Sequence, residues 1–211
     1  MHSVVPLNVH YYGTPVVLVS STNPDGTTNL APMSSAWWLG QEAMLGLGSS
    51  SRTTQNLLRT GECVLNLAPS DLVDHVDRLA LLTGTPELSE HKRATGYRYE
   101  PRKFEAAGLT PQASELVLPD RVLECPIQLE CVVSGHHIID TDSTSAQAIH
   151  VSVVRAHVDD PVRLPGTAYV DPQAWDPLIM KFCDFFGSGE PLVPSRLAAG
   201  WGMPGRLEAA S

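Results

Sequence analysis

Hydroxyl side chains gather directly before a segment with helical periodicity. The run Ser49-Ser50-Ser51-Arg52-Thr53-Thr54 precedes an amphipathic stretch that ends at Gly61. The first amides of a helix lack intrahelical partners and carry partial positive charge. Hydroxyls add donors, and an arginine fork matches a phosphate. The run therefore fits a phosphate-binding loop, but taken alone it favours a serine-rich helix cap with a solvated arginine.

Common catalytic signatures are absent from the sequence. Gly46-Leu47-Gly48 lacks the third glycine of a dinucleotide-binding loop, and no P-loop, HExxH or GxSxG motif occurs. His136 and His137 are adjacent, so on a strand they point to opposite faces and do not form a ligand set. We therefore expect a site that holds a cofactor, without a metal, and we assign no catalytic residue.

The elements that must position these residues are mostly short strands. Residues 15–21, 27–38 and 43–48 are expected to form an antiparallel meander, with Pro32 at an edge or a bulge and Gly135 in a later hairpin bend. Helices are predicted at 51–60, 70–82 and 175–186, and further strands at 63–67, 121–123, 127–133, 136–139 and 147–158.

This order of elements predicts one domain over residues 1–211. Consecutive short strands without regular βαβ alternation favour a mainly β, α+β fold, namely a small antiparallel barrel with appended helices. Residues 83–118 have too few apolar side chains for a core of their own, so we expect a helical or loop excursion that covers a ligand or a subunit contact. The glycine- and proline-rich C-terminal tail is expected to be extended.

The excursion carries a basic and aromatic stretch, KRATGYRYEPRKF. Arg98, Arg102 and Lys103 in this stretch form either a solvated basic face or a contact for a partner subunit or a cosubstrate phosphate. The sequence favours the solvated face.

Composition narrows the classes of function. The chain has 211 residues, of which 43% are hydrophobic and 18% charged, as expected for a folded globular protein. Its net charge is -9, from 14 basic and 23 acidic residues. An acidic surface repels nucleic acids and anionic lipids, so we expect no nucleic-acid or membrane partner.

The cysteines and the N-terminal residues indicate the compartment. The four cysteines form no CxxC pair, and Cys63 and Cys131 lie in apolar runs where a free thiol behaves as a small hydrophobe. No signal peptide and no apolar run of membrane-spanning length is visible. We expect a cytoplasmic protein.

The sequence resembles the flavin reductase-like family of FMN-binding split barrels. The resemblance rests on NLAPMSS at 29–35, on SRTTQN followed by RTGECVLNL, and on GYRYEPRKFEAAGLTPQASE followed by ECPIQLEC. It covers the chain from about Gly13 to Val158. The order and spacing of these motifs carry more weight than any one of them.

The resemblance implies a homodimer with one FMN near each subunit contact. It places the flavin ring and ribityl chain beside Asn29, Leu30, Ala31, Met33, Ser34 and Ser35, and the phosphate beside Ser49, Ser50, Ser51, Arg52 and Thr53. FAD is the alternative flavin. Many relatives carry an acidic residue where this chain has Arg52, so the role of the arginine is left open.

The resemblance also implies an activity. We expect an NAD(P)H-dependent flavin reductase that transfers hydride from a nicotinamide cosubstrate to FMN, with a monooxygenase as partner. Hydride transfer needs no acid or base residue, in agreement with the missing catalytic motifs. The alternatives are an FMN-binding electron carrier or storage protein that NAD(P)H does not reduce, and an FMN-dependent oxidase of a small metabolite.

Overall fold

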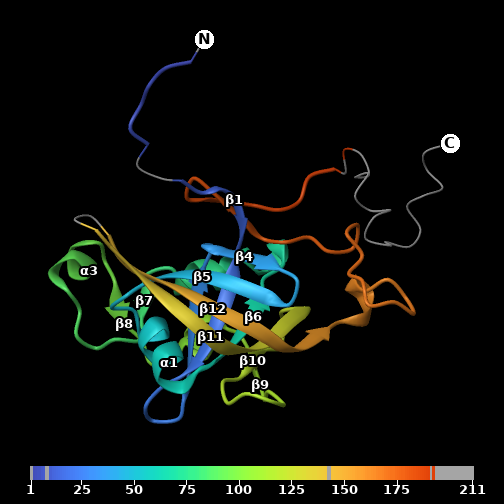
Figure 1. Ribbon diagram of the computed structural model, residues 1–211, viewed down its shortest axis with the longest axis horizontal. Helices are drawn as coiled ribbons and strands as arrows, with labels where there is room; N and C mark the ends of the chain where they lie inside the picture. Colours follow the sequence, from blue (N-terminus) through green and yellow to red (C-terminus); the bar gives the residue numbers. More distant parts are fainter. Residues whose placement is uncertain (1, 8–9, 142–143, 191, 193–211) are drawn as a thin grey trace.

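The structure is a computed structural model that describes residues 2–7, 10–141, 144–190 and 192. Its centre is a seven-stranded antiparallel sheet with the order β3–β2–β6–β11–β12–β5–β4 (Figure 1). The strands are β2 (Val17–Thr22), β3 (Thr28–Met33), β4 (Ala36–Leu39), β5 (Glu42–Gly48), β6 (Glu62–Leu67), β11 (Ile127–Thr141) and β12 (Thr144–Val158). The prediction of a mainly β fold with appended helices is confirmed.

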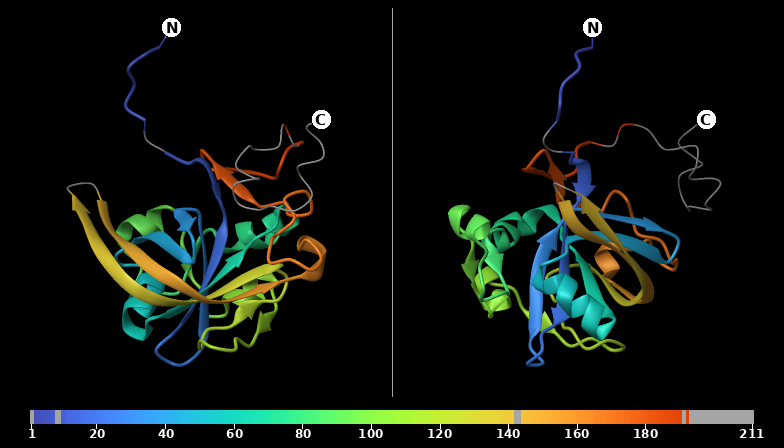
Figure 2. Two further views of the ribbon diagram at one scale, coloured as in Figure 1. Left: turned by 45° about the vertical axis from the view of Figure 1, so that its right-hand side comes forward. Right: turned by 60° about the vertical axis from the view of Figure 1, so that its left-hand side comes forward.

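The two edge strands of this sheet, β3 and β4, are consecutive in the chain, and only Ser34 and Ser35 separate them. The sheet curls so that its opposite edges approach each other, and the long pair β11–β12 bends across the molecule (Figure 2). Within the described part of the chain β3 does not pair with β4, so the sheet does not close. The middle strand predicted at 27–38 is two strands, β3 and β4, and both pairings of the predicted meander occur: β2 with β3 and β4 with β5. On its other side β5 pairs with β12.

The first helix forms as its sequence predicts. In α1 (Arg52–Thr60), the Ser51 side chain accepts a hydrogen bond from the Thr54 amide, and Gly61 ends the helix in the left-handed conformation at φ 73°. The helix predicted at 70–82 is a 3-10 turn, η1 (Ser70–Leu72), followed by α2 (Val73–Leu79). No described helix is both long and apolar enough to cross a membrane.

The excursion between α2 and β11 is a series of short elements. It contains β7 (Leu82–Thr83), α3 (Glu90–Ala94), β8 (Arg98–Tyr99), α4 (Lys103–Ala107), β9 (Pro111–Gln112) and β10 (Arg121–Val122). β7 and β8 pair in parallel, which fixes the loop that carries α3. The excursion is fastened to the sheet where it returns, because the fully buried carboxylate of Glu130 accepts hydrogen bonds from the amides of Glu115 and Leu116.

After β12 the chain makes a short 3-10 turn, η2 (Asp160–Val162), and forms a small separate sheet. In this sheet β1 (Tyr12–Pro15) pairs with β13 (Ile179–Lys181), which pairs with β14 (Asp184–Phe186). The helix predicted at 175–186 is therefore wrong. Asp176, its expected cap, instead accepts hydrogen bonds from the Ser70 hydroxyl and the Ser188 amide.

The core forms two clusters, one on each face of the curled sheet. Alternation along β2 divides its side chains: Leu18 packs with α2 and α4, while Val17 and Val19 pack with α1 and the inner faces of β5, β6 and β12. The hairpin bend expected at Gly135 is also wrong. β11 continues past Gly135 as one strand, with a register shift against β12 between Val133 and Gly135. The predicted tail at 194–211 lies outside the described residues.

Candidate functional site

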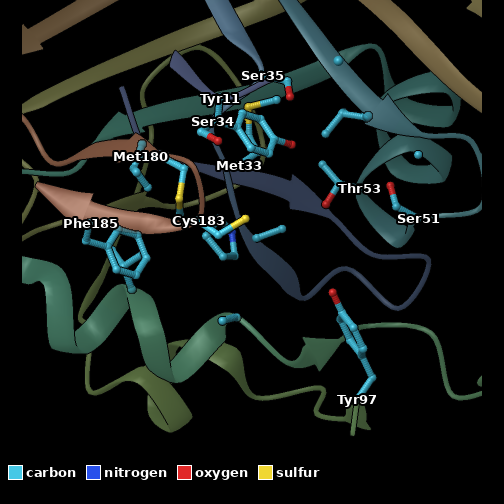
Figure 3. Close-up of a pocket in the computed structure, with 18 residues that line it drawn as sticks. Tyr11, Met33, Ser34, Ser35, Ser51, Thr53, Tyr97, Met180, Cys183 and Phe185 are labelled. Carbon is cyan, nitrogen blue, oxygen red and sulfur yellow. The ribbon is translucent and has the colours of Figure 1, made fainter. Parts of the chain in front are cut away.

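A pocket of about 500 Å³ lies where the edge strand β3 meets the start of α1 (Figure 3). Small-molecule sites in proteins span roughly 300–1,000 Å³, so the pocket has the size of a cofactor site. Its inner wall comes from β3, the Ser34–Ser35 link and the end of β5, and its outer wall from α2, the excursion and the small β1–β13–β14 sheet.

The inner wall is built from residues with small side chains. Ala31, Ser34, Ser35, Gly46 and Gly48 line the pocket and leave the backbone close to its surface. The Gly46 amide donates to the Ser35 carbonyl at 2.8 Å, which holds the link between the sheet edges against β5. A Cβ on Gly46 would lie 3.1 Å from the Ser35 Cβ, so a glycine permits this close approach.

The start of α1 forms one end of the pocket. Ser51 and Thr53 line it. The loop before the helix is held in place because the Ser51 amide and the Thr54 hydroxyl both donate to the Gly48 carbonyl, at 3.0 and 2.8 Å. Asn29 donates to the Thr53 hydroxyl at 3.2 Å and so joins β3 to the helix. The buried Oδ1 of Asn29 has no partner among the described residues.

The outer wall comes from three segments that are distant in the sequence. Tyr11 precedes β1, Tyr97 lies in the excursion between α3 and β8, and Met180, Cys183 and Phe185 belong to the β13–β14 hairpin. Figure 3 shows Tyr97 with its hydroxyl directed to the side of the pocket where Thr53 and Ser51 lie. Val76 of α2 and Ala80, its C-cap, complete this wall.

The structure brings together part of the predicted site. Six predicted residues line the pocket: Ala31, Met33, Ser34, Ser35, Ser51 and Thr53. Asn29 lies behind Thr53, and the Leu30 side chain is fully buried in the core. Ser49, Ser50 and Arg52 are not among the lining residues. The Arg52 Nε donates to the Gly84 carbonyl at 3.0 Å, so the arginine is turned toward the start of the excursion.

Sequence reasoning missed the outer wall and the glycines. Tyr11, Tyr97 and Cys183 carry no local motif, because each reaches the pocket only through long-range pairing of its strand or loop. In the sequence, Gly46 and Gly48 stand out only as an incomplete dinucleotide motif. Along β5 these glycines alternate with the buried residues Leu45 and Leu47. This alternation could have predicted that the other face of the strand carries no side chains at these positions.

The described lining of the pocket has no Asp, Glu, His, Lys or Arg side chain. No group of three or more His, Cys, Asp and Glu residues in the described chain is arranged to hold a metal ion. The arrangement can enclose a flat, polar-edged ligand and present backbone and hydroxyl groups to it.

The curled antiparallel sheet and the uncharged pocket define a class of ligand-holding β protein. The model of the flavin reductase like domain matches residues 9–175 of this chain. The chain therefore belongs to the flavin reductase-like family. Membership in this flavin-binding family supports a flavin as the cofactor.

Individual relatives agree with this assignment. An uncharacterized Bacillus subtilis protein, YdfE, is 38% identical over 181 residues, which cover 86% of each chain. Flavoredoxin of Desulfovibrio vulgaris has a similar structure, with a TM-score of 0.75 and 20% identity over 94% of this chain and 100% of that one.

Two further solved structures share the fold. Nitrilotriacetate monooxygenase component B from Bacillus cereus has a TM-score of 0.73 and 21% identity, over 92% of this chain and 98% of that chain. A Shewanella frigidimarina protein named as a flavin reductase with a split barrel domain has a TM-score of 0.67 and 19% identity, over 87% and 86% of the two chains. At these identities the likeness shows a shared fold.

Proposed function

We propose that this protein is a flavin reductase that binds FMN in the pocket and takes hydride from NAD(P)H. The observation that carries the proposal is the composition of the pocket in a chain of this family. The pocket has the volume of a cofactor site, small residues on one wall, a helix start at one end, and no Asp, Glu, His, Lys or Arg among its described lining residues.

The residues present fit a flavin mononucleotide. A flat ring needs a wall without bulky side chains, and Ala31, Gly46 and Gly48 supply one. A phosphate needs free amides and hydroxyls, and the start of α1 supplies them at Ser51 and Thr53. The pocket gives no reason to prefer FAD, which stays the alternative.

The residues of this chain would bind the flavin and orient it. We propose that Asn29 to Ser35 hold the ring and ribityl chain and that Ser49 to Thr53 hold the phosphate, with Leu30 contributing through its backbone alone. When bound, a flavin supplies the capacity to accept hydride from a nicotinamide. Tyr11, Met180 and Phe185 on the outer wall would exclude water from the ring.

We also propose that the protein acts as a homodimer. Several large apolar side chains near the pocket are exposed, including Trp37 at 58% and Leu39 at 70% on the edge strand β4. Trp37 also lines an apolar groove with Tyr11, Met44 and Ala148, next to the flavin pocket. A second copy that covers this groove would bury the apolar edge and place a subunit contact beside the flavin.

The proposed acceptor of the reduced flavin is a partner monooxygenase. The likeness to a protein named as a monooxygenase component supports this pairing. We propose a cytoplasmic location, since flavin and nicotinamide substrates are metabolites of the cell interior.

The test is a turnover assay with free FMN. Purified protein is mixed with FMN and either NADH or NADPH, and oxidation of the nicotinamide is followed by absorbance. We expect a rate well above the protein-free control, and a tenfold or larger loss when Ala31 is replaced by Phe, which fills the inner wall. A rate equal to the protein-free control with both nicotinamides rejects the proposal.

A second candidate is an electron-carrying flavoprotein that NAD(P)H does not reduce. The absence of a dinucleotide motif and the structural likeness to a flavoredoxin favour it. It predicts a yellow protein that dithionite bleaches and that neither nicotinamide changes. The visible spectrum before and after each reductant separates the two candidates.

A further inference from the structure

Four buried polar side chains join α1 to the sheet behind it. Ser21 on β2, Asn29 on β3, and Thr53 and Asn56 on α1 each have at most 3% of their surface exposed. Polar groups in such a place lower the stability of a protein unless they are hydrogen-bonded. Leu57, next to Asn56, shows that an apolar residue packs well between this helix and the sheet. The polar residues therefore call for a role other than stability.

Hydrogen bonds connect these four side chains in a row. The Asn56 Nδ2 donates to the Ser21 Oγ at 3.1 Å, and the Asn29 Nδ2 donates to the same oxygen at 3.4 Å. The Asn29 Nδ2 also donates to the Thr53 Oγ1 at 3.2 Å. We call these four residues the α1 polar network. Among them Thr53 alone lines the pocket, so the network leads from the buried side of α1 to the cofactor site.

The Thr53 hydroxyl is left with a proton to donate. Within the described chain, the bond from Asn29 is the one hydrogen bond that this hydroxyl forms, and the hydroxyl accepts it. A hydroxyl that accepts from an amide still has its own O–H to give to another acceptor. Hydrogen bonds to an ionised acceptor are roughly twice as strong as those between neutral groups. The network therefore orients Thr53 in a way that favours an anionic group, such as a phosphate, over a neutral one.

The two asparagines of the network are held at their other ends as well. The Asn56 Nδ2 donates to the Asn23 Oδ1 at 3.0 Å, in the turn after β2. The Asn29 Oδ1 faces the backbone of the excursion, since a Cβ at Gly84 would lie 2.6 Å from this oxygen. The Asn29 side chain therefore has little room to rotate away from Thr53.

A second pair on the same strand offers a comparison. Ser20 precedes Ser21 on β2, so its side chain points to the opposite face of the sheet. The Ser20 Oγ accepts a hydrogen bond at 3.0 Å from Asn66, a fully buried asparagine of β6. Asn66 also donates to the Leu18 carbonyl and accepts from the Val122 amide. Ser20 and Asn66 match Ser21 and Asn56 in type and burial, and neither of them lines the pocket or belongs to the α1 polar network.

We propose that Asn56 and Ser21 are positioning residues for the phosphate of the flavin. Neither lines the pocket. Both act through Asn29, which they hold so that the Thr53 hydroxyl is directed at a phosphate oxygen. The inference rests on the proposed function for its choice of ligand, but it is tested by binding and requires no turnover.

The test compares two flavins that differ by the phosphate alone. FMN and riboflavin are titrated by flavin fluorescence into wild type, Asn56→Ala and Ser21→Ala, in phosphate-free buffer at pH 7. Wild type is expected to bind FMN at least tenfold more tightly than riboflavin. Each variant should raise the Kd of FMN at least fivefold and change the Kd of riboflavin less than twofold, because only FMN carries the group that Thr53 meets.

Asn66→Ala and Ser20→Ala are the matched controls. They remove the same chemical groups from equally buried positions, so they should lower the melting temperature in the same way. The ratio of the Kd of riboflavin to that of FMN should nevertheless stay within twofold of the wild-type ratio. The comparison separates a role in positioning from a general loss of stability.

A double-mutant cycle tests the path through Thr53. Thr53→Val removes the hydroxyl and keeps the branched shape of the side chain. If Asn56 acts through this hydroxyl, adding Asn56→Ala to Thr53→Val should change the Kd of FMN less than twofold. The full fivefold effect of Asn56→Ala in this background would overturn the proposal.

The proposal also fails if Asn56→Ala and Ser21→Ala weaken riboflavin as much as FMN, or if the two controls change the ratio equally. Should Asn56→Ala not fold by circular dichroism, Ser21→Ala decides the outcome alone, because it removes a single hydroxyl. A protein that binds FMN through this network yet oxidises no nicotinamide disproves the proposed reductase and keeps the positioning role. A wild-type protein that binds neither flavin overturns both.

Discussion

At the scale of single residues, the pocket depends on the absence of a side chain at Gly46. The backbone of the link between β3 and β4 lies directly on this glycine, through the bond from its amide to Ser35. A larger residue must push the link away from β5, because even a Cβ at this position would lie 3.1 Å from the Cβ of Ser35. Such a change would therefore displace the Ser34–Ser35 link, which forms part of the pocket wall.

Gly46→Val is therefore expected to weaken flavin binding at least tenfold. Overpacking at this position should also lower the free energy of unfolding by about 1–3 kcal/mol. Flavin fluorescence titration and urea unfolding measure the two effects. Gly135→Ala is the control, since no atom lies within 4 Å of its added Cβ and the position is far along β11. Equal loss of binding in both variants would contradict the role of Gly46.

Lys103 provides a pH-dependent prediction. Because the side chain is buried, its pKa of about 8 in the folded protein is below the 10.5 of a free lysine, so the folded state loses this proton first as the pH rises. Wild type should then gain stability between pH 8 and 10.5 relative to Lys103→Met, by up to about 3 kcal/mol if the full shift is realised.

Below pH 8 we expect the opposite order of stability, with Lys103→Met more stable than wild type. The folded wild type must keep a charged group buried, so Lys103→Met should be the more stable protein at pH 7, by about 1–3 kcal/mol. Urea unfolding of both proteins at pH 7 and pH 10 checks the two statements. A stability difference that does not change with pH would show that Lys103 titrates normally.

At the scale of elements, local sequence signals determine some helices and strands, and long-range strand pairing determines others. Ser51 and Gly61 directly flank the nine residues of α1, so that helix could be predicted. Residues 175–186 carry a pattern that fits a helix equally well. What decides against it is the pairing of β13 with β1, including the bond from the Phe182 amide to the carbonyl of Tyr11, a residue at the other end of the chain.

The turn between β13 and β14 is strained. Phe182 and Cys183 both have positive φ, 48° and 71°, in a two-residue hairpin turn where asparagine and glycine are usual. Cys183→Gly should therefore raise the free energy of unfolding by about 1 kcal/mol. Urea unfolding under reducing conditions measures it, with Cys125→Ala as a comparison that should destabilise, since Cys125 is buried in the core. A lower stability for Cys183→Gly would show that its thiol contributes more than the turn costs.

The candidate site likewise combines parts that local sequence motifs predict with parts that only long-range contacts bring together. The inner wall and the helix start could be predicted, because Ala31, Ser34 and Ser51 stand in contiguous motifs that the resemblance to the family assigns to the cofactor. The outer wall could not, because Tyr11, Tyr97 and Phe185 come from three separate segments that only the tertiary fold brings together.

At the scale of the whole molecule, the exposed apolar edge predicts assembly. Trp37 on β4 is 58% exposed, whereas its neighbour Trp38 packs against the core, as alternation along a strand requires. Wild type is expected to sediment as a dimer and Trp37→Glu as a monomer, in analytical ultracentrifugation at micromolar concentration. Leu118→Glu, a similar charge change at an exposed apolar residue of the excursion, should remain dimeric. A wild-type protein that sediments as a monomer would contradict the homodimer proposal.

The meeting of the two sheet edges at Ser34 and Ser35 has a consequence for the order of folding. The β2–β3, β4–β5 and β11–β12 hairpins join neighbouring segments and can form within microseconds. β5 pairs with β12 across about a hundred residues, and such non-local pairing is slow because loop closure must come first. The Ser34–Ser35 wall reaches its final position only when β3 and β5 both belong to one sheet. During refolding, recovery of flavin binding should therefore follow the slowest phase, after most strand signal in circular dichroism has returned.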